Sequence, residues 1–281
     1  MRNAALDRII PGLLIGLLIA LLGLVGASTA LAEDAIAFKR HGKTVATLNP
    51  KSQFVEEIVE VYEPHEHRTV RYRAVPLHEV LDSSYGPGWR DEEELLFTCA
   101  DGYQPSIPLA TLLSHSPYLA FARADGRPFL IDNHDQGEFE VALGPWYLVW
   151  ENIEDQAPLM RDSALWPYQV VQLDLIRFEE RFARMLPPRA ERDEHQAGFL
   201  AFRHHCMSCH QVNGQGGGKS RDLNRPNILT LRDEAWLEAY IDDPTRFTPG
   251  VPMPAFDRDA PERAATIRRI VAYLGVMAET E

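Results

Sequence analysis

The sequence predicts two folded domains, an α+β domain followed by an all-α domain, behind an apolar N-terminal segment. Residues 33–185 contain short runs of β-branched and aromatic residues between glycine- and proline-containing turns, which is typical of short strands and short helices. Residues 186–281 instead place apolar residues at helical spacing. A proline-containing stretch at residues 185–189 separates the two patterns and is taken as the linker.

The N-terminal segment, residues 1–32, contains an uncharged and largely apolar run at residues 9–25 that follows two arginines. Small residues occupy the positions that a signal peptidase reads, so a secretory signal cleaved after Ala32 is predicted. The run is slightly shorter than the roughly 20 residues that span a bilayer, and an uncleaved membrane anchor is the open alternative. In either case the rest of the chain is expected in the periplasm.

The first domain is predicted to contain six strands and two short helices. The strands are expected at residues 56–62, 70–75, 94–98, 118–123, 139–143 and 147–150. Residues 76–81 predict one short helix, and residues 101–109 predict an exposed turn that leads into another.

The second domain is predicted to contain three helices. Residues 193–205 form the first, with aromatic residues and a small glycine on it, and residues 230–242 form the second. The third runs to about Ala278, with Asp259 as its N-cap and Glu262 three residues further on.

A C-x-x-C-H motif follows the first of these helices directly, at Cys206, Cys209 and His210. Two thiols three positions apart can each form a thioether with one vinyl group of a single haem. The adjacent histidine can then ligate the iron. The glycine-rich loop at residues 213–218 is flexible enough to wrap around a ring edge. The motif therefore predicts one covalently bound haem c.

Two other uses of the motif fit the sequence less well. A zinc site would need about four ligands, and Cys99 is the one cysteine outside the motif. A thioredoxin-like redox pair should open a helix inside a βαβ unit, and no such pattern surrounds the motif. With two cysteines assigned to haem, Cys99 has no disulfide partner and is expected to be buried in a strand.

A second axial ligand is expected from Met253, which lies between two prolines that stiffen an extended loop. A thioether ligand there would stabilise ferrous iron and raise the reduction potential. Met207 should point away from the ring, while Met185 and Met277 are expected to be packing residues. Iron with two protein ligands has no open position, which favours one-electron transfer over bond chemistry.

Residues 190–281 resemble a class I cytochrome c. The resemblance rests on four features, which are a first helix with Gly198 and Phe202, the C-M-S-C-H string, the Met-Pro turn at Met253, and Ala-Tyr-Leu at residues 272–274. It implies that Cys206 and Cys209 bind haem, that His210 and Met253 ligate iron, and that the first and last helices cross near Gly198.

Residues 50–155 resemble the molybdopterin-binding domain of sulfite-oxidase-like enzymes. The matching strings are D-G-Y-Q-P-S-I-P-L at residues 101–109, Leu-Ala at 119–120, D-G-R-P at 125–128 and G-P-W-Y at 144–147. In that family the cysteine that ligates molybdenum lies well upstream of the D-G-Y turn, where this chain has none, and Cys99 is in the wrong register. The domain is also much shorter, so it is interpreted as a reduced sulfite-oxidase-like fold without molybdenum.

Negative charge is concentrated in the first domain. Residues 33–188 carry 26 acidic and 14 basic side chains, whereas residues 189–281 carry 14 and 12. The densest acidic cluster is at residues 91–94. This charge argues against nucleic acid and anionic lipid as partners and favours a basic protein partner, although a simple solvated acidic face explains it equally well.

The first domain contains a second group of candidate metal ligands. His65 and His67 would share one face of an extended segment, and further candidate ligands follow at Asp132, His134, Asp135 and Glu138. Copper or zinc could use such groups. Exposed histidines in polar loops are the favoured interpretation.

These observations predict a periplasmic monohaem c-type cytochrome that transfers single electrons in a respiratory chain, with an acidic docking domain for a redox protein partner. A membrane respiratory complex is one such partner, and membrane contact is otherwise expected only through an N-terminal anchor. The alternative is a haem-containing molybdenum oxidoreductase of sulfite-oxidase type, against which the missing cysteine counts. An electron carrier is therefore favoured over an enzyme.

Overall fold

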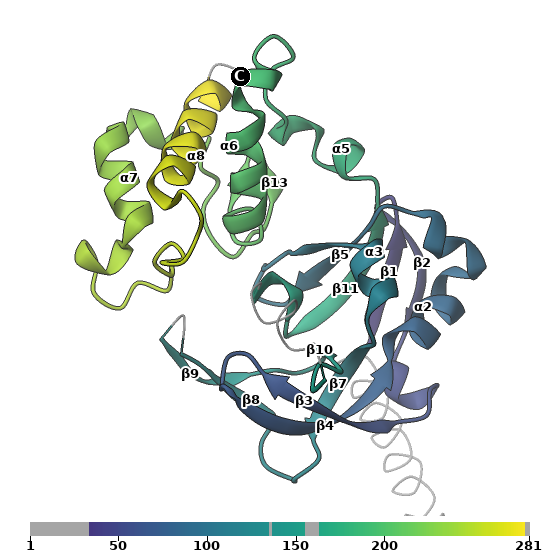
Figure 1. The fold of residues 1–281 in the computed structure, drawn as a ribbon. Coiled ribbons are helices and arrows are strands. Elements are labelled where there is room, and N and C mark those ends of the chain that lie inside the picture. The colour runs from purple at the N-terminus through teal and green to yellow at the C-terminus, as the bar shows by residue number, and fades with distance from the viewer. Residues whose placement is uncertain (1–33, 135–136, 155–162, 279–281) are drawn as a thin grey trace, which may run out of the picture.

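The computed structural model describes residues 34–134, 137–154 and 163–278 (Figure 1). The predicted leader at residues 1–32 lies outside the described residues. Within the described ranges, no helix combines the length and the apolar character needed to cross a bilayer.

The first domain is rich in β-structure and is built on two main sheets (Figure 1). The five-stranded sheet has the order β2-β1-β11-β5-β6, and the four-stranded sheet has the order β10-β7-β4-β3. The strands are β1 (Ile36–Arg40), β2 (Lys43–Leu48), β3 (Glu57–Glu63), β4 (Arg68–Pro76), β5 (Glu94–Cys99), β6 (Ser106–Pro108), β7 (Pro117–Arg123), β8 (Leu130–Asn133), β9 (Glu138–Ala142), β10 (Tyr147–Trp150) and β11 (Val170–Ile176). Strands β8 and β9 form a separate ribbon, and the helices α2 (Leu77–Tyr85) and α3 (Leu109–Ser114) complete the domain.

Strand β4 shows why these residues form a sheet with one buried face. Val70, Tyr72 and Ala74 alternate inward and are buried, while the arginines between them are exposed. The strand pairs with β3 through the register Val61↔Val70 and with β7 through Val75↔Leu119. The buried side chains join one core that includes four buried tryptophans, Trp89, Trp146, Trp150 and Trp166.

Every strand predicted in the first domain is present within a few residues, but β1, β2, β6, β8 and β11 were not predicted. Strand β2 is an exposed edge without a clear apolar alternation. Strand β11 is central, yet its apolar run is interrupted by Asp174, whose carboxylate accepts a hydrogen bond from the Gly42 amide at 3.1 Å. Its place between β1 and β5 is a tertiary feature that local pattern does not reveal.

The second domain is helical, with α6 (Arg192–His205), α7 (Glu234–Asp242) and α8 (Arg263–Met277), and a short hairpin of β12 (Gln211–Val212) and β13 (Gln215–Gly216). The expected N-cap at Asp259 is wrong. Helix α8 begins four residues later, after Glu262 with φ +49°. The Arg263 guanidinium donates to the carbonyls of Asp257 and Phe256, so the preceding segment folds as a turn around this side chain.

The segment between the domains packs with the helices. Helix α5 (Phe178–Arg181) follows β11 almost immediately, and Phe178, Phe182 and Met185 lie in the core of the helical domain. Leu96 of β5 lies in the same core. Side chains that precede the proline-containing stretch at 185–189 therefore already belong to the second core.

Candidate functional site

Helix α6 delivers the C-x-x-C-H motif at its C-terminal end. Cys206 is the C-cap residue, and its amide donates to the Phe202 carbonyl at 2.8 Å. The amides of Cys209 and His210 both donate to the Cys206 carbonyl, at 3.2 and 2.9 Å, which closes the motif into a tight turn. Both cysteines are free thiols. The turn therefore brings together the three motif residues that the sequence predicted.

The surroundings of the two thiols suit uncharged sulfur. Burial raises the pKa of Cys206 to about 12 and that of Cys209 to about 11, so both are neutral thiols at pH 7. A thioether carries no charge at any pH, and it can replace a neutral thiol without an electrostatic penalty. The site is therefore chemically compatible with two thioether bonds to haem.

His210 is held in the tautomer that a metal ligand needs. Its Nδ1 lies 3.1 Å from the Arg221 carbonyl oxygen. A carbonyl oxygen only accepts, so Nδ1 carries the proton and Nε2 keeps its lone pair for iron. Burial also lowers the pKa of His210, which favours the neutral ring. The orienting role of the Arg221 carbonyl could not be predicted, because a backbone oxygen has no sequence signature.

Two glycines of the loop after the motif pack tightly against it. A Cβ at Gly216 would lie 2.4 Å from the His210 carbonyl oxygen, and one at Gly217 would lie 1.8 Å from the Ser208 carbonyl oxygen. The Gly217 amide donates to the Met207 carbonyl at 2.8 Å. The loop predicted to be flexible is thus partly a β-hairpin fixed to the motif, and its glycines are required by close backbone contact.

The predicted helix crossing is present. Helices α6 and α8 pack against one another, and a Cβ at Gly198 would lie 2.1 Å from the Arg269 carbonyl oxygen. Tyr273 of α8 contacts Phe202, with ring centroids 5.3 Å apart. Its hydroxyl donates to the Met185 carbonyl at 2.6 Å.

Met253 lies in the loop before α8, half-buried against the second core. Met185 and Met277 are buried in that core, as expected of packing residues, and Met207 is buried there too. Among the methionines that the structure describes, Met253 is therefore the one with an accessible thioether. Its role as iron ligand remains a prediction.

The candidate ligands of the first domain do not come together. His65 is buried, contrary to the expectation of an exposed histidine. Its ring packs edge-on against that of Tyr168, with ring centroids 6.4 Å apart. His67 is exposed at φ +51°, so the two imidazoles do not share a face. No group of three potential ligands suited to a metal is found in the described ranges, which exclude Asp135. Cys99 is buried at the end of β5, and burial raises its pKa well above the usual value.

Three helices around a C-x-x-C-H turn with a pre-oriented histidine define a c-type cytochrome domain. Residues 196–276 match the family model for cytochrome c, which begins inside α6 and ends inside α8. This part of the chain is therefore a cytochrome c domain, and covalent haem c follows from that match. No curated protein matches the chain.

Proposed function

We propose that this chain is an exported carrier of single electrons, with one haem c bound through Cys206 and Cys209 and ligated by His210 and Met253. Haem bound there would supply a one-electron iron couple. The observation that carries the proposal is the Nδ1 contact of His210 with the Arg221 carbonyl, because it prepares Nε2 as a ligand beside two free thiols. The cytochrome c match to residues 196–276 supports it independently.

The covalent attachment is tested by acid–acetone extraction of the purified protein. Haem should stay with the polypeptide, at one haem per chain by the pyridine haemochrome assay. The Cys206→Ala/Cys209→Ala double variant should lose it, whereas Cys99→Ala should retain it. Extraction of haem from the unmodified protein would overturn the proposal.

Metal analysis of the same preparation addresses the alternative of a molybdenum oxidoreductase. Protein made in a host that synthesises the pterin should contain stoichiometric iron and no stoichiometric molybdenum. One molybdenum per chain, or sulfite oxidation that depends on Cys99, would make the enzyme the better account.

A further inference from the structure

The turn between β5 and β6 lies directly against the haem-attachment segment. The Gln104 amide donates to the carbonyl of Ser208, one of the two residues between the motif cysteines, at 2.8 Å. The Gly218 amide donates to the Gly102 carbonyl, also at 2.8 Å. Two backbone hydrogen bonds therefore join the first domain to both sides of the loop that carries Cys209 and His210.

This contact leaves no room for a side chain at Gly102. Its φ is +89°, and a Cβ there would lie 2.8 Å from the Gly218 carbonyl carbon and 2.9 Å from the Lys219 amide nitrogen. Cβ contacts under 3.0 Å force the backbone to shift. The close approach of the two domains at this point thus depends on glycine.

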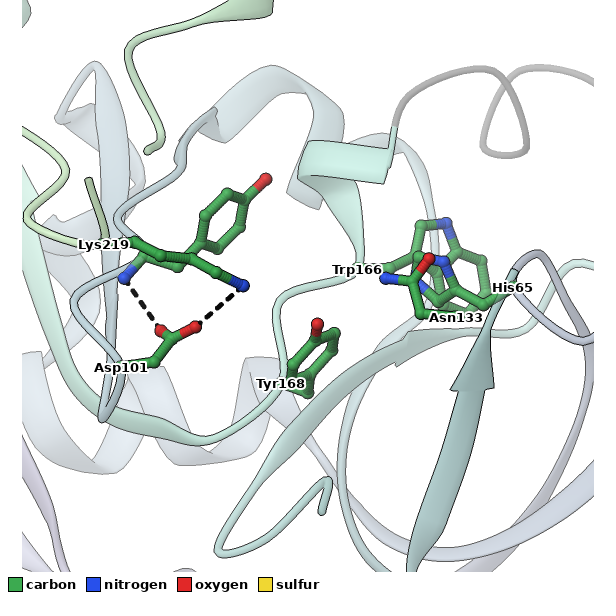
Figure 2. Close-up of a pocket in the computed structure, with 7 residues that line it drawn as sticks. His65, Asp101, Asn133, Trp166, Tyr168 and Lys219 are labelled. Atoms are coloured by element: carbon green, nitrogen blue, oxygen red, sulfur yellow. Dashed lines mark hydrogen bonds and ion pairs between the residues drawn. The ribbon is translucent and has the colours of Figure 1, made fainter. Parts of the chain in front are cut away.

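Asp101 fixes the turn and reaches across to the second domain (Figure 2). One carboxylate oxygen accepts from the Tyr103 amide at 2.9 Å, and the other lies 3.1 Å from the Lys219 ammonium. The ion pair forms one wall of a small pocket between the domains, opposite His65, Asn133 and Trp166. Both side chains are about three-quarters buried, with 28% and 23% of their surface exposed.

The ion pair lies close to the haem-attachment segment. The amide of Ser220, the residue after Lys219, donates to the carbonyl of the motif residue Cys209 at 2.9 Å. One of the two attachment cysteines therefore lies within electrostatic range of the domain contact. A group bound at Cys209 would be subject to the field of this ion pair.

We propose that Asp101, Gly102, Gln104 and Lys219, here called the interdomain lock, position the haem centre and set its reduction potential. The inference rests on the proposed function, which places haem at Cys206 and Cys209. Oxidised haem carries one more positive charge than reduced haem, so excluding water from this side disfavours the oxidised form. The Lys219 ammonium also disfavours the oxidised form, while the Asp101 carboxylate favours it.

The steric part of the lock is tested by Gly102→Ala, with Gly126→Ala as the matched control. Both glycines follow an aspartate in a tight turn, with φ +89° and +77°, but a Cβ at Gly126 meets nothing within 4 Å. Each preceding carboxylate accepts from the amide two residues on. Spectroelectrochemical titration should show a lower midpoint potential for Gly102→Ala, with at least a threefold shift of the reduction equilibrium. Gly126→Ala should match the unmodified protein.

The charge part is tested with two milder variants. Asp101→Asn keeps the turn's amide hydrogen bond and should raise the potential, whereas Lys219→Met should lower it. Shifts of the same sign would overturn the role assigned to the charges. If Gly102→Ala, Asp101→Asn and Lys219→Met all have normal haem content and an unchanged midpoint potential, the proposal as a whole is overturned.

Two further measurements separate this inference from the proposed function. Haem content is read first, because missing covalent haem contradicts the proposed function itself. Hydrogen exchange at the Gly218 and Gln104 amides then reports the lock independently of haem. Exchange should be at least tenfold faster in Gly102→Ala than in Gly126→Ala, and equal rates would show that no lock exists.

Discussion

Met253 is the methionine of the helical domain that is only half-buried, whereas Met207 and Met277 are buried. We expect Met253→Leu to lose the weak near-infrared band of methionine-ligated ferric haem and to lower the midpoint potential, because the sulfur ligand is gone. Met277→Leu removes a thioether of the same size from α8 and should retain both properties. If Met253→Leu keeps the near-infrared band, a residue other than Met253 is the sixth ligand.

Glu63 is a buried carboxylic acid that no sequence pattern predicted. It ends β3 on the inward face, and the hydroxyls of Tyr72 and Tyr147 donate to it at 3.1 and 3.0 Å. Burial raises its pKa from 4.5 to about 7, against the opposing effect of these hydrogen bonds and the His65 amide. Between pH 4.5 and about 7, Glu63 therefore keeps its proton in the folded state, whereas it has lost that proton in the unfolded state.

This shift predicts a pH dependence of stability with a definite sign. The folded pKa is raised, so stability falls as pH rises from about 4.5 to about 7, by roughly 3 kcal/mol. Glu63→Gln keeps an acceptor for the tyrosine hydroxyls and should remove this contribution. Urea unfolding at a series of pH values measures this contribution. If the free energy of unfolding changes with pH in the same way in Glu63→Gln and in the unmodified protein, the pH dependence does not come from Glu63.

At the scale of elements, the crossing of α6 and α8 depends on Gly198. Gly198→Ala should destabilise the helical domain by about 1–3 kcal/mol, because the added methyl overlaps the Arg269 carbonyl. Gly275→Ala is the control within α8, since its Cβ would meet only Leu229 at 3.4 Å and alanine favours helix. Thermal unfolding, followed by haem absorbance and by circular dichroism, should give a lower melting temperature for Gly198→Ala than for Gly275→Ala. Equal melting temperatures would show that the crossing tolerates a side chain.

Elements with strong periodicity were predictable from sequence, and elements defined by distant pairing were not. Helix α6 and strand β4 carry local apolar patterns that determine their type. The central β11 and the edge β2 depend on partners far away in the chain. The C-x-x-C-H residues of the site were visible as a motif. The contact of His210 with the Arg221 carbonyl and the contacts of the interdomain lock form only where separate segments of the chain meet.

At the scale of the whole molecule, the acidic cluster at residues 91–94 is partly structural. Glu92 pairs with Arg40 at 2.7 Å, and the Glu93 carboxylate accepts from the Phe178 amide at 3.0 Å. Glu94 is buried and pairs with Arg203 of α6. These carboxylates support the fold and the domain contact, so a test of electrostatic docking should target other acidic residues.

We expect electron transfer from the reduced protein to a small basic redox protein to slow as salt rises. Exposed charges are screened over about 8 Å at physiological ionic strength. Replacing the exposed Glu60, Glu151 and Glu154 by glutamine should flatten this salt dependence. Stopped-flow rates of the variant and the unmodified protein should converge at high salt. An unchanged slope would mean that these carboxylates do not contribute to docking.

The position of β11 also determines the order in which the molecule can assemble. This strand comes last in the first domain, yet it lies between β1 and β5, so the five-stranded sheet stays open until residue 176 has been made. Domains generally fold as units, with the N-terminal domain first. When Cys206 emerges thirty residues later, the turn at Asp101 can already be in place. The first domain would then serve as a template on which the cytochrome loop takes its final shape.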